Sequence, residues 1–249
     1  MIAERAPSTP TSLRDDADWY VRMWAFFART GLRCFTRVRI DGLAEAVAKL
    51  PPSGPLILAS NHASNADGVL IGGWVMPALG RRIHWLGKRE MIDAPIMGPL
   101  ARRGSVHPVD RAGADVEAFR LAVRILEEGH VLMVFPEGTR SHDGRLQDAK
   151  DGLAMLALRT GARILPIGVS GTHRFWPRGS MWRIGGQITL RAGDPFTLEE
   201  TLGADALKDR RMAKTLATRE IMGRIAALLP EDQRGAYGGE ARAGQDGTA

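Results

Sequence analysis

Residues 55–67, Pro55-Leu-Ile-Leu-Ala-Ser-Asn-His-Ala-Ser-Asn-Ala-Asp67, run from an apolar segment into a polar turn. The apolar run predicts a buried strand, and Ser64 and Asn65 suit the turn and the start of a helix after it. His62 and Asp67 would lie roughly 140° apart on one straight helix. Their side chains can therefore meet only if His62 lies on the turn and Asp67 near the helix start.

Strand-like and helix-like runs alternate on both sides of this stretch. Strands are predicted at 38–40, 55–59, 83–86, 105–109, 131–135, 164–169 and 188–190. Helices are predicted at 18–37, 68–75, 114–128, 152–159 and 206–229. Such alternation predicts an α/β fold with a mostly parallel or mixed sheet flanked by helices.

The length of 249 residues fits one domain of this class, which we expect at 38–230. A flexible leader is expected at 1–14, an amphipathic helix at 15–37 and a flexible tail at 231–249. The longest uncharged apolar stretch, 68–80, is too short and too rich in Gly and Pro for a membrane-spanning helix. We therefore expect no transmembrane segment.

Composition narrows the functional classes. Hydrophobic residues make up 44% and charged residues 25%, which excludes a fully disordered chain, collagen and a coiled-coil rod. Cys34 is the single cysteine, which excludes an intramolecular disulfide framework and a zinc site made of several thiolates. The net charge of +6, from 34 Lys and Arg against 28 Asp and Glu, indicates an anionic partner. Nucleic acid, a phosphate-bearing substrate and an acidic membrane surface all fit that description.

The segment from Trp19 to Ile40 holds five arginines and no acidic residue. On a helical wheel four arginines share one side, and they are Arg22, Arg29, Arg33 and Arg37. The opposite side collects Tyr20, Trp24, Phe27, Phe35 and Val38, while Trp19 and Phe26 fall near the arginine edge. This pattern is typical of a helix lying in a membrane interface. It is equally typical of a helix that packs its aromatic side on the protein's own core. Nucleic-acid binding is a third interpretation, but no helix-turn-helix, zinc-finger or RNP-like motif supports it.

His62 and Asp67 can form a general base. A carboxylate bonded to Nδ1–H fixes the tautomer of the imidazole, which leaves Nε2 free to take a proton from a hydroxyl. The alternative is a histidine in a polar loop and an aspartate favoured by the dipole of the following helix.

A second strand-to-turn segment is Val131-Leu-Met-Val-Phe-Pro-Glu-Gly-Thr-Arg-Ser141. Loops at strand ends commonly carry binding groups in α/β folds, and Arg140 offers a planar fork suited to phosphate. The same turn could also be simple strand termination.

Together these segments resemble the glycerophospholipid acyltransferase superfamily, typified by lysophosphatidic acid acyltransferases, over residues 38–200. The resemblance rests on N-H-x-S-x-x-D at 61–67 and F-P-E-G-T-R-S at 135–141, with Gly87-Lys-Arg-Glu90 and a glycine-to-arginine block at 104–111 between them. The block at 104–111 is one residue longer than the usual pattern and contains His107-Pro108. Lys150 and Gly152 match a further habit of the family.

The resemblance implies transfer of a fatty acyl group from acyl-CoA, or from acyl-carrier protein, to the hydroxyl of a lysophospholipid such as 1-acyl-glycerol 3-phosphate. His62 and Asp67 would be catalytic. Residues implied to bind substrate are Glu137, Gly138, Thr139, Arg140, Arg111, Lys88 and Lys150. No G-x-S-x-G nucleophile motif is present, since Gly168-Val-Ser-Gly-Thr172 departs at its last position, which agrees with a one-step transfer.

The expected partners are a lysophospholipid, an acyl thioester and an anionic membrane surface, with no nucleic acid, metal or bound cofactor. The remaining histidines lack ligand-like spacing and are expected to be structural or exposed. The expected location is the cytoplasmic face of a membrane, as a peripheral protein. Two alternatives remain open, an acyltransferase for another lysolipid or a glycolipid, and a non-catalytic protein that binds anionic membranes.

Overall fold

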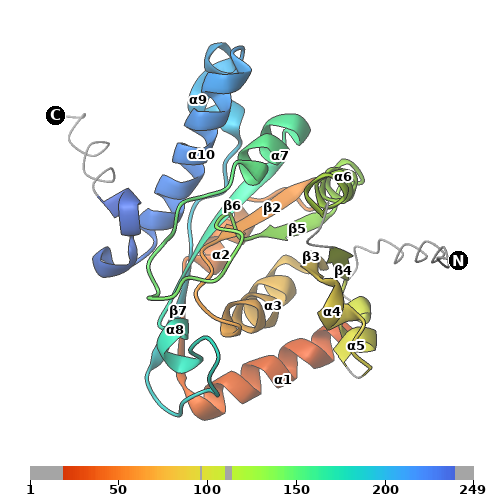
Figure 1. Cartoon of the computed structure of the whole chain (residues 1–249), viewed down its shortest axis with the longest axis vertical. Coiled ribbons are helices and arrows are strands. Elements are labelled where there is room, and N and C mark those ends of the chain that lie inside the picture. Colours follow the sequence, from red (N-terminus) through yellow and green to blue (C-terminus); the bar gives the residue numbers. More distant parts are fainter. Residues whose placement is uncertain (1–18, 96, 110–113, 239–249) are drawn as a thin grey trace, which may run out of the picture.

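One seven-stranded sheet forms the centre of the computed structural model, which describes residues 19–95, 97–109 and 114–238. The strand order is β1-β7-β6-β2-β5-β3-β4 (Figure 1). The strands are β1 (Arg37–Asp41), β2 (Leu56–Ser60), β3 (Ile83–Lys88), β4 (Val106–Val109), β5 (Val131–Val134), β6 (Arg163–Ser170) and β7 (Gln187–Ala192). All neighbours are parallel except β6 and β7. The predicted α/β class with a mixed sheet is confirmed.

Helices cover both faces of the sheet (Figure 1). One face carries α1 (Trp19–Phe35), α2 (Leu43–Ala48) and α3 (Ala66–Leu79), and the other carries α6 (Ala114–Glu127), α7 (Gly152–Thr160) and α10 (Arg210–Ala227). Shorter elements are α4 (Arg89–Ile92), α5 (Met97–Arg103), α8 (Thr172–Phe175), α9 (Leu198–Ala206) and the 3-10 turns η1 (Glu231–Gln233) and η2 (Gly235–Gly238). Among the described helices, none is long and apolar enough to cross a bilayer.

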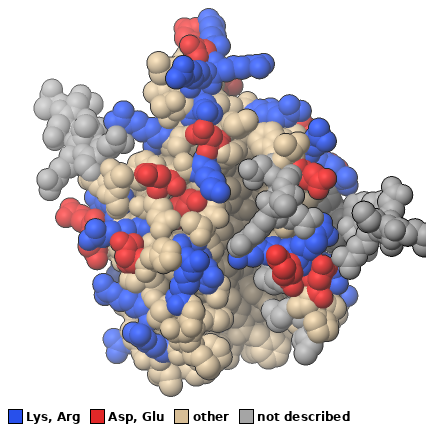
Figure 2. Space-filling model, viewed as in Figure 1, with Lys and Arg blue, Asp and Glu red and all other residues tan. Residues whose placement is uncertain are grey.

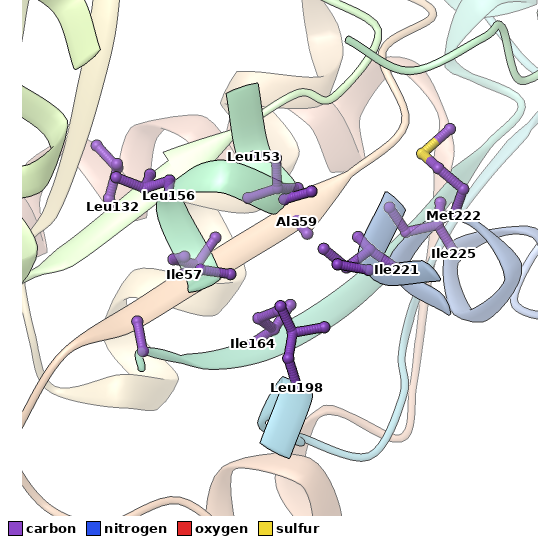
Figure 3. Close-up of a cluster of buried hydrophobic side chains, with 14 of the residues drawn as sticks. Ile57, Ala59, Leu132, Leu153, Leu156, Ile164, Leu198, Ile221, Met222 and Ile225 are labelled. Carbon is purple, nitrogen blue, oxygen red and sulfur yellow. The ribbon is translucent and has the colours of Figure 1, made fainter. Parts of the chain in front are cut away.

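Strand β2 is buried along its whole length because it lies between β5 and β6. Its side chains alternate between two cores. Leu58 faces the core under α3, whereas Ile57 and Ala59 face the core under α7 and α10 (Figure 3). The carboxyl end of β2 therefore opens in the middle of the sheet, where residues 61–67 follow.

The amphipathic segment is shorter than the predicted helix at 15–37. Helix α1 ends at Phe35, and Arg37 begins β1 because its N–H group donates to Gly186 O beside β7 (3.1 Å). Residues 15–18 and the predicted leader at 1–14 lie outside the described residues.

The two sides of α1 also differ from the helical-wheel prediction. Tyr20 is buried and Trp24 is half-buried against α3, where a Cβ added at Gly72 would lie 2.6 Å from the Trp24 ring. Phe27 and Phe35, predicted on the same side, are exposed.

The arginines of α1 are divided between the two sides as well. Arg29 Nε donates to Gly73 O (2.6 Å), and Arg33 lies over the Trp74 ring, whereas Arg22 is exposed. One side of the helix therefore packs on the protein's own core, while the membrane-interface interpretation of the exposed side stays a prediction.

The C-terminal region departs from prediction at two points. The helix predicted at 206–229 begins at Arg210, because the Asp209 side chain accepts the N–H groups of the first turn. The flexible tail predicted from residue 231 is ordered through residue 238. There Gln233 is buried and its carbonyl accepts the Leu146 N–H (2.8 Å).

Candidate active site

His62 and Asp67 meet at the carboxyl end of β2. His62 lies on the turn and Asp67 in the first turn of α3, and His62 Nδ1 is 2.9 Å from Asp67 Oδ2. Because a carboxylate oxygen accepts, Nδ1 carries the proton and Nε2 is left with a lone pair. The His62 side chain is 22% exposed, whereas that of Asp67 is fully buried. The geometry is that of an oriented imidazole with one nitrogen open to a substrate.

The same Asp67 oxygen also holds the turn in shape. Oδ2 accepts the backbone N–H groups of Ala63 (2.7 Å) and Ser64 (2.8 Å) as well as the imidazole. Oδ1 is buried and has no hydrogen-bond partner among the described residues. One oxygen thus fixes both the backbone around His62 and the direction of its ring.

Glu137 holds His62 from a segment 75 residues away. Its Oε1 accepts the His62 backbone N–H (2.6 Å), and its Oε2 accepts the Gln147 N–H (2.9 Å). Burial raises the pKa of Glu137 to about 7, although the two N–H donors oppose that shift. Glu137 is buried and both of its oxygens are used, so it positions His62. The expectation that Glu137 also contacts the substrate stays a prediction.

Arg140 and Gly138 lie on the open side of the turn after β5, which also carries Glu137. Arg140 Nη1 donates to Asn65 Oδ1 (2.9 Å), which joins the second segment to the first. Gly138 has φ +67°, and a Cβ at this position would lie 3.0 Å from Lys150 Cδ. Thr139 is exposed beside them. The structure therefore brings the cations of Arg140 and Lys150 to the turn that holds the His62 backbone.

Two other predicted substrate-binding residues are not brought into this group. Lys88 is exposed at the end of β3, and among the described residues it makes no hydrogen bond or ion pair with the site. Arg111 lies outside the described residues. Of the four predicted cations, the structure therefore brings Arg140 and Lys150 to the site.

Sequence reasoning missed three contacts that shape the site. Asn61 pins the end of β2 to β6, because its side chain exchanges two 2.8 Å bonds with the Val169 backbone. Ser64 Oγ donates to Trp176 O (2.8 Å), and the Phe135 ring stacks on the His62 ring with centroids 4.0 Å apart. Asn61 and Ser64 belong to the 61–67 motif and Phe135 to the 135–141 motif, but their partners are distant in sequence, so spacing alone could not reveal these contacts.

A groove of about 940 Å³ opens beside the second segment, between α6, α7 and β5. Its apolar lining includes Phe119, Val123, Leu132, Val134, Leu153 and Leu156. Phe135, Gly138 and Lys150 also line the groove, so it reaches the turn that carries Glu137. A long apolar group could lie there with its polar end at the site.

The other histidines do not form a metal centre. His84 Nδ1 and His107 Nε2 are 2.9 Å apart and the two rings stack, while burial lowers the pKa of His107 to about 4. Within the described parts of the chain, no group of three or more potential ligands could hold a metal ion.

Comparison with known proteins gives consistent matches. The family model described as Acyltransferase matches residues 43–170. The chain is 31% identical over 162 residues to the chloroplastic 1-acyl-sn-glycerol-3-phosphate acyltransferase LPAT1 of Arabidopsis thaliana, covering 64% of this chain and 42% of that protein. It is 32% identical over 177 residues to the human 1-acyl-sn-glycerol-3-phosphate acyltransferase alpha, covering 69% and 61%. The chain therefore spans about half the length of the curated relatives it matches.

A solved structure is similar over most of the fold. The crystal structure of the 1-acyl-sn-glycerophosphate acyltransferase from Thermotoga maritima superposes with a TM-score of 0.62 at 26% identity. The match covers 81% of this chain and 78% of that one.

Proposed function

This chain belongs to the acyltransferase family, and we propose that it transfers a fatty acyl group from a thioester to the hydroxyl of 1-acyl-glycerol 3-phosphate. The observation that carries the proposal is the 2.9 Å contact between His62 Nδ1 and Asp67 Oδ2. It leaves Nε2 as the available base. The names of the relatives support the choice of acceptor.

In the proposed step, His62 Nε2 takes the proton of the acceptor hydroxyl while the oxygen attacks the thioester carbonyl. A C–O bond forms, the C–S bond breaks, and the proton passes from the imidazolium to the leaving thiolate. Asp67 stabilises the imidazolium at its Nδ1 side. The acyl donor is the thioester of CoA or of acyl-carrier protein.

Arg140 and Lys150 are proposed to hold the phosphate of the acceptor. Arg140 has donors beyond the one it gives to Asn65, and guanidinium groups bind phosphate through two parallel bonds. The acyl chain of the donor is proposed to lie in the groove between α6 and α7, whose lining is mainly apolar and which reaches Gly138. In the expected phosphatidic acid product, the phosphate stays beside Arg140 and Lys150.

The place of action is proposed to be the cytoplasmic face of a membrane, with α1 at the surface. Support comes from the exposed residues of α1, which include Trp19, Phe26 and Phe27 beside Arg22. Peripheral attachment fits a lipid acceptor, because the acceptor does not leave the bilayer readily.

The direct test is acyl transfer from radiolabelled acyl-CoA or acyl-carrier protein to 1-acyl-glycerol 3-phosphate in detergent micelles, with the product identified by mass spectrometry. We expect phosphatidic acid from the wild type and at least about a hundredfold slower turnover from His62→Ala. Undiminished turnover in His62→Ala would overturn the mechanism. Preference for a phosphate-free lysolipid would overturn the acceptor and the role of Arg140.

A further inference from the structure

A second surface element lies beside α1, and it is the loop of residues 176–184, Trp176-Pro-Arg-Gly-Ser-Met-Trp-Arg-Ile184. Backbone bonds fasten this 176–184 loop at both ends. Arg183 N–H donates to Phe175 O (2.7 Å), and Gly185 N–H donates to Phe35 O at the end of α1 (2.7 Å). The loop and α1 therefore form one continuous part of the surface, at the lower edge of the molecule in Figure 1.

The 176–184 loop exposes three large apolar side chains. Met181 is 72% exposed, Ile184 81% and Trp182 43%. The Trp182 ring lies 6.1 Å from the Phe35 ring, and a shallow apolar hollow of about 190 Å³ between loop and helix is lined by Phe27, Phe35, Trp176 and Trp182. Large exposed apolar patches mark contact sites with proteins or membranes.

The charge around these side chains has one sign. Residues 19–40 and 172–193 contain no aspartate or glutamate. The exposed arginines of the two segments include Arg22, Arg33, Arg174, Arg178 and Arg183. Within the described ranges none of these five forms an ion pair with an acidic group. Figure 2 shows the corresponding lower edge as mostly tan with blue residues.

We propose that the 176–184 loop inserts into the interface of an anionic phospholipid bilayer, as a second membrane contact beside α1. Tryptophan, methionine and isoleucine side chains enter the acyl boundary, while the arginines reach anionic headgroups. A second copy of this chain fits less well, because facing copies would bring arginines of like charge together. This inference rests on the proposed function, because the acceptor of that reaction is a membrane lipid.

The 176–184 loop is also joined to the candidate active site. Trp176 O accepts from Ser64 Oγ, and Arg178 Nη1 lies 3.0 Å from His142 Nε2, just after the 131–141 segment. A bilayer bound by the loop and α1 would therefore lie beside the turn that carries His62. The loop sets the orientation of the site to the lipid surface.

The test compares vesicle co-sedimentation of the full chain with a Met181→Asp/Ile184→Asp variant. Met212→Asp is the matched control, since Met212 is 56% exposed on α10, away from this edge. We expect at least about a tenfold weaker partition of the double variant into phosphatidylcholine–phosphatidylglycerol vesicles, and wild-type partition of the control. Wild-type partition should be stronger into vesicles that contain phosphatidylglycerol than into pure phosphatidylcholine vesicles. The Arg178→Gln/Arg183→Gln variant should lose only this difference.

Wild-type partition of the double variant would overturn the proposal. A lipid-free wild-type dimer that the double variant converts to a monomer would also overturn it, because the surface would then belong to a second copy. Turnover in detergent separates this result from the proposed function. Absence of wild-type turnover contradicts the acyltransferase proposal whatever the vesicle data show, whereas turnover retained by a double variant that no longer binds vesicles supports both.

Discussion

Replacing Asp67 by asparagine should separate its electrostatic role from its structural one. Asp67 Oδ2 accepts three N–H groups, while Oδ1 is buried without a partner. An asparagine oxygen can take the position of Oδ2 and keep all three bonds, and its amide nitrogen then occupies the place of Oδ1, where no donor opposes it. The turn should therefore survive the loss of charge.

The expected loss is catalytic. When His62 takes a proton, the carboxylate stabilises an imidazolium about 4 Å away between charge centres, which is worth about 4 kcal/mol at an effective dielectric constant of about 20. Since 1.36 kcal/mol is tenfold in rate, Asp67→Asn should lower kcat about a thousandfold. Asp67→Ala should in addition leave the N–H groups of Ala63 and Ser64 without an acceptor and cost about 2–6 kcal/mol of unfolding free energy.

The assay is release of free CoA at saturating acceptor, paired with urea unfolding of each variant. Asp143→Asn is a matched control, because Asp143 is an exposed carboxylate close to the same turn. We expect the control to keep kcat within about twofold of wild type and its free energy of unfolding within about 0.5 kcal/mol of wild type. An Asp67→Asn enzyme within tenfold of wild-type kcat, or an Asp67→Ala protein as stable as Asp67→Asn, would refute the reasoning.

Three further predictions follow from separate features. Arg140→Ala should raise KM about 10–100-fold for a phosphate-bearing lysolipid but not for a phosphate-free one, and equal losses for both would remove Arg140 from the phosphate site. Gly72→Ala should destabilise the fold by about 1–3 kcal/mol in urea unfolding, because its Cβ would lie 2.6 Å from the Trp24 ring, whereas Gly223→Ala on α10 meets nothing within 4 Å and should not destabilise. The pKa of His107 is lowered to about 4 in the folded state. The contribution of neutral His107 to the free energy of unfolding is therefore fully present above pH 6.5 and is lost as the pH falls toward 4. Between pH 7 and 5 the wild type should lose about 2 kcal/mol more than His107→Gln, and parallel losses would contradict this.

The sheet was the most predictable part of the molecule. Buried parallel strands are nearly continuous apolar runs, so all seven strands are predicted within a few residues of their observed bounds. The short helices α2, α4 and α8 have 6, 4 and 4 residues, too few for a helical period to show in the sequence. Helix α9 was also missed, because Gly203 interrupts it with a non-helical backbone.

The site was predictable only within single segments. The contact of His62 with Asp67 could be predicted because both lie in one strand–turn–helix unit. The bond from the His62 N–H to Glu137 spans 75 residues, and the bonds between Asn61 and Val169 span 108. These require the order of β5, β2 and β6 in the sheet, which strand patterns do not specify. The part that Glu137 plays in holding the His62 backbone was missed for this reason.

The position of β2 between β5 and β6 brings several elements to the turn that carries His62. Asn61 fastens the strand end to β6, Glu137 fastens the His62 backbone to the turn after β5, and Asp67 fastens the next two N–H groups to α3. Three consecutive parts of the turn are thus held by three different elements. Under the proposed mechanism, His62 would lose little freedom when substrate binds, because its backbone is already held before the reaction begins. Substitutions at Asn61 and Glu137 should consequently lower kcat more than they raise KM, because they move His62 without touching the groups that hold the acceptor.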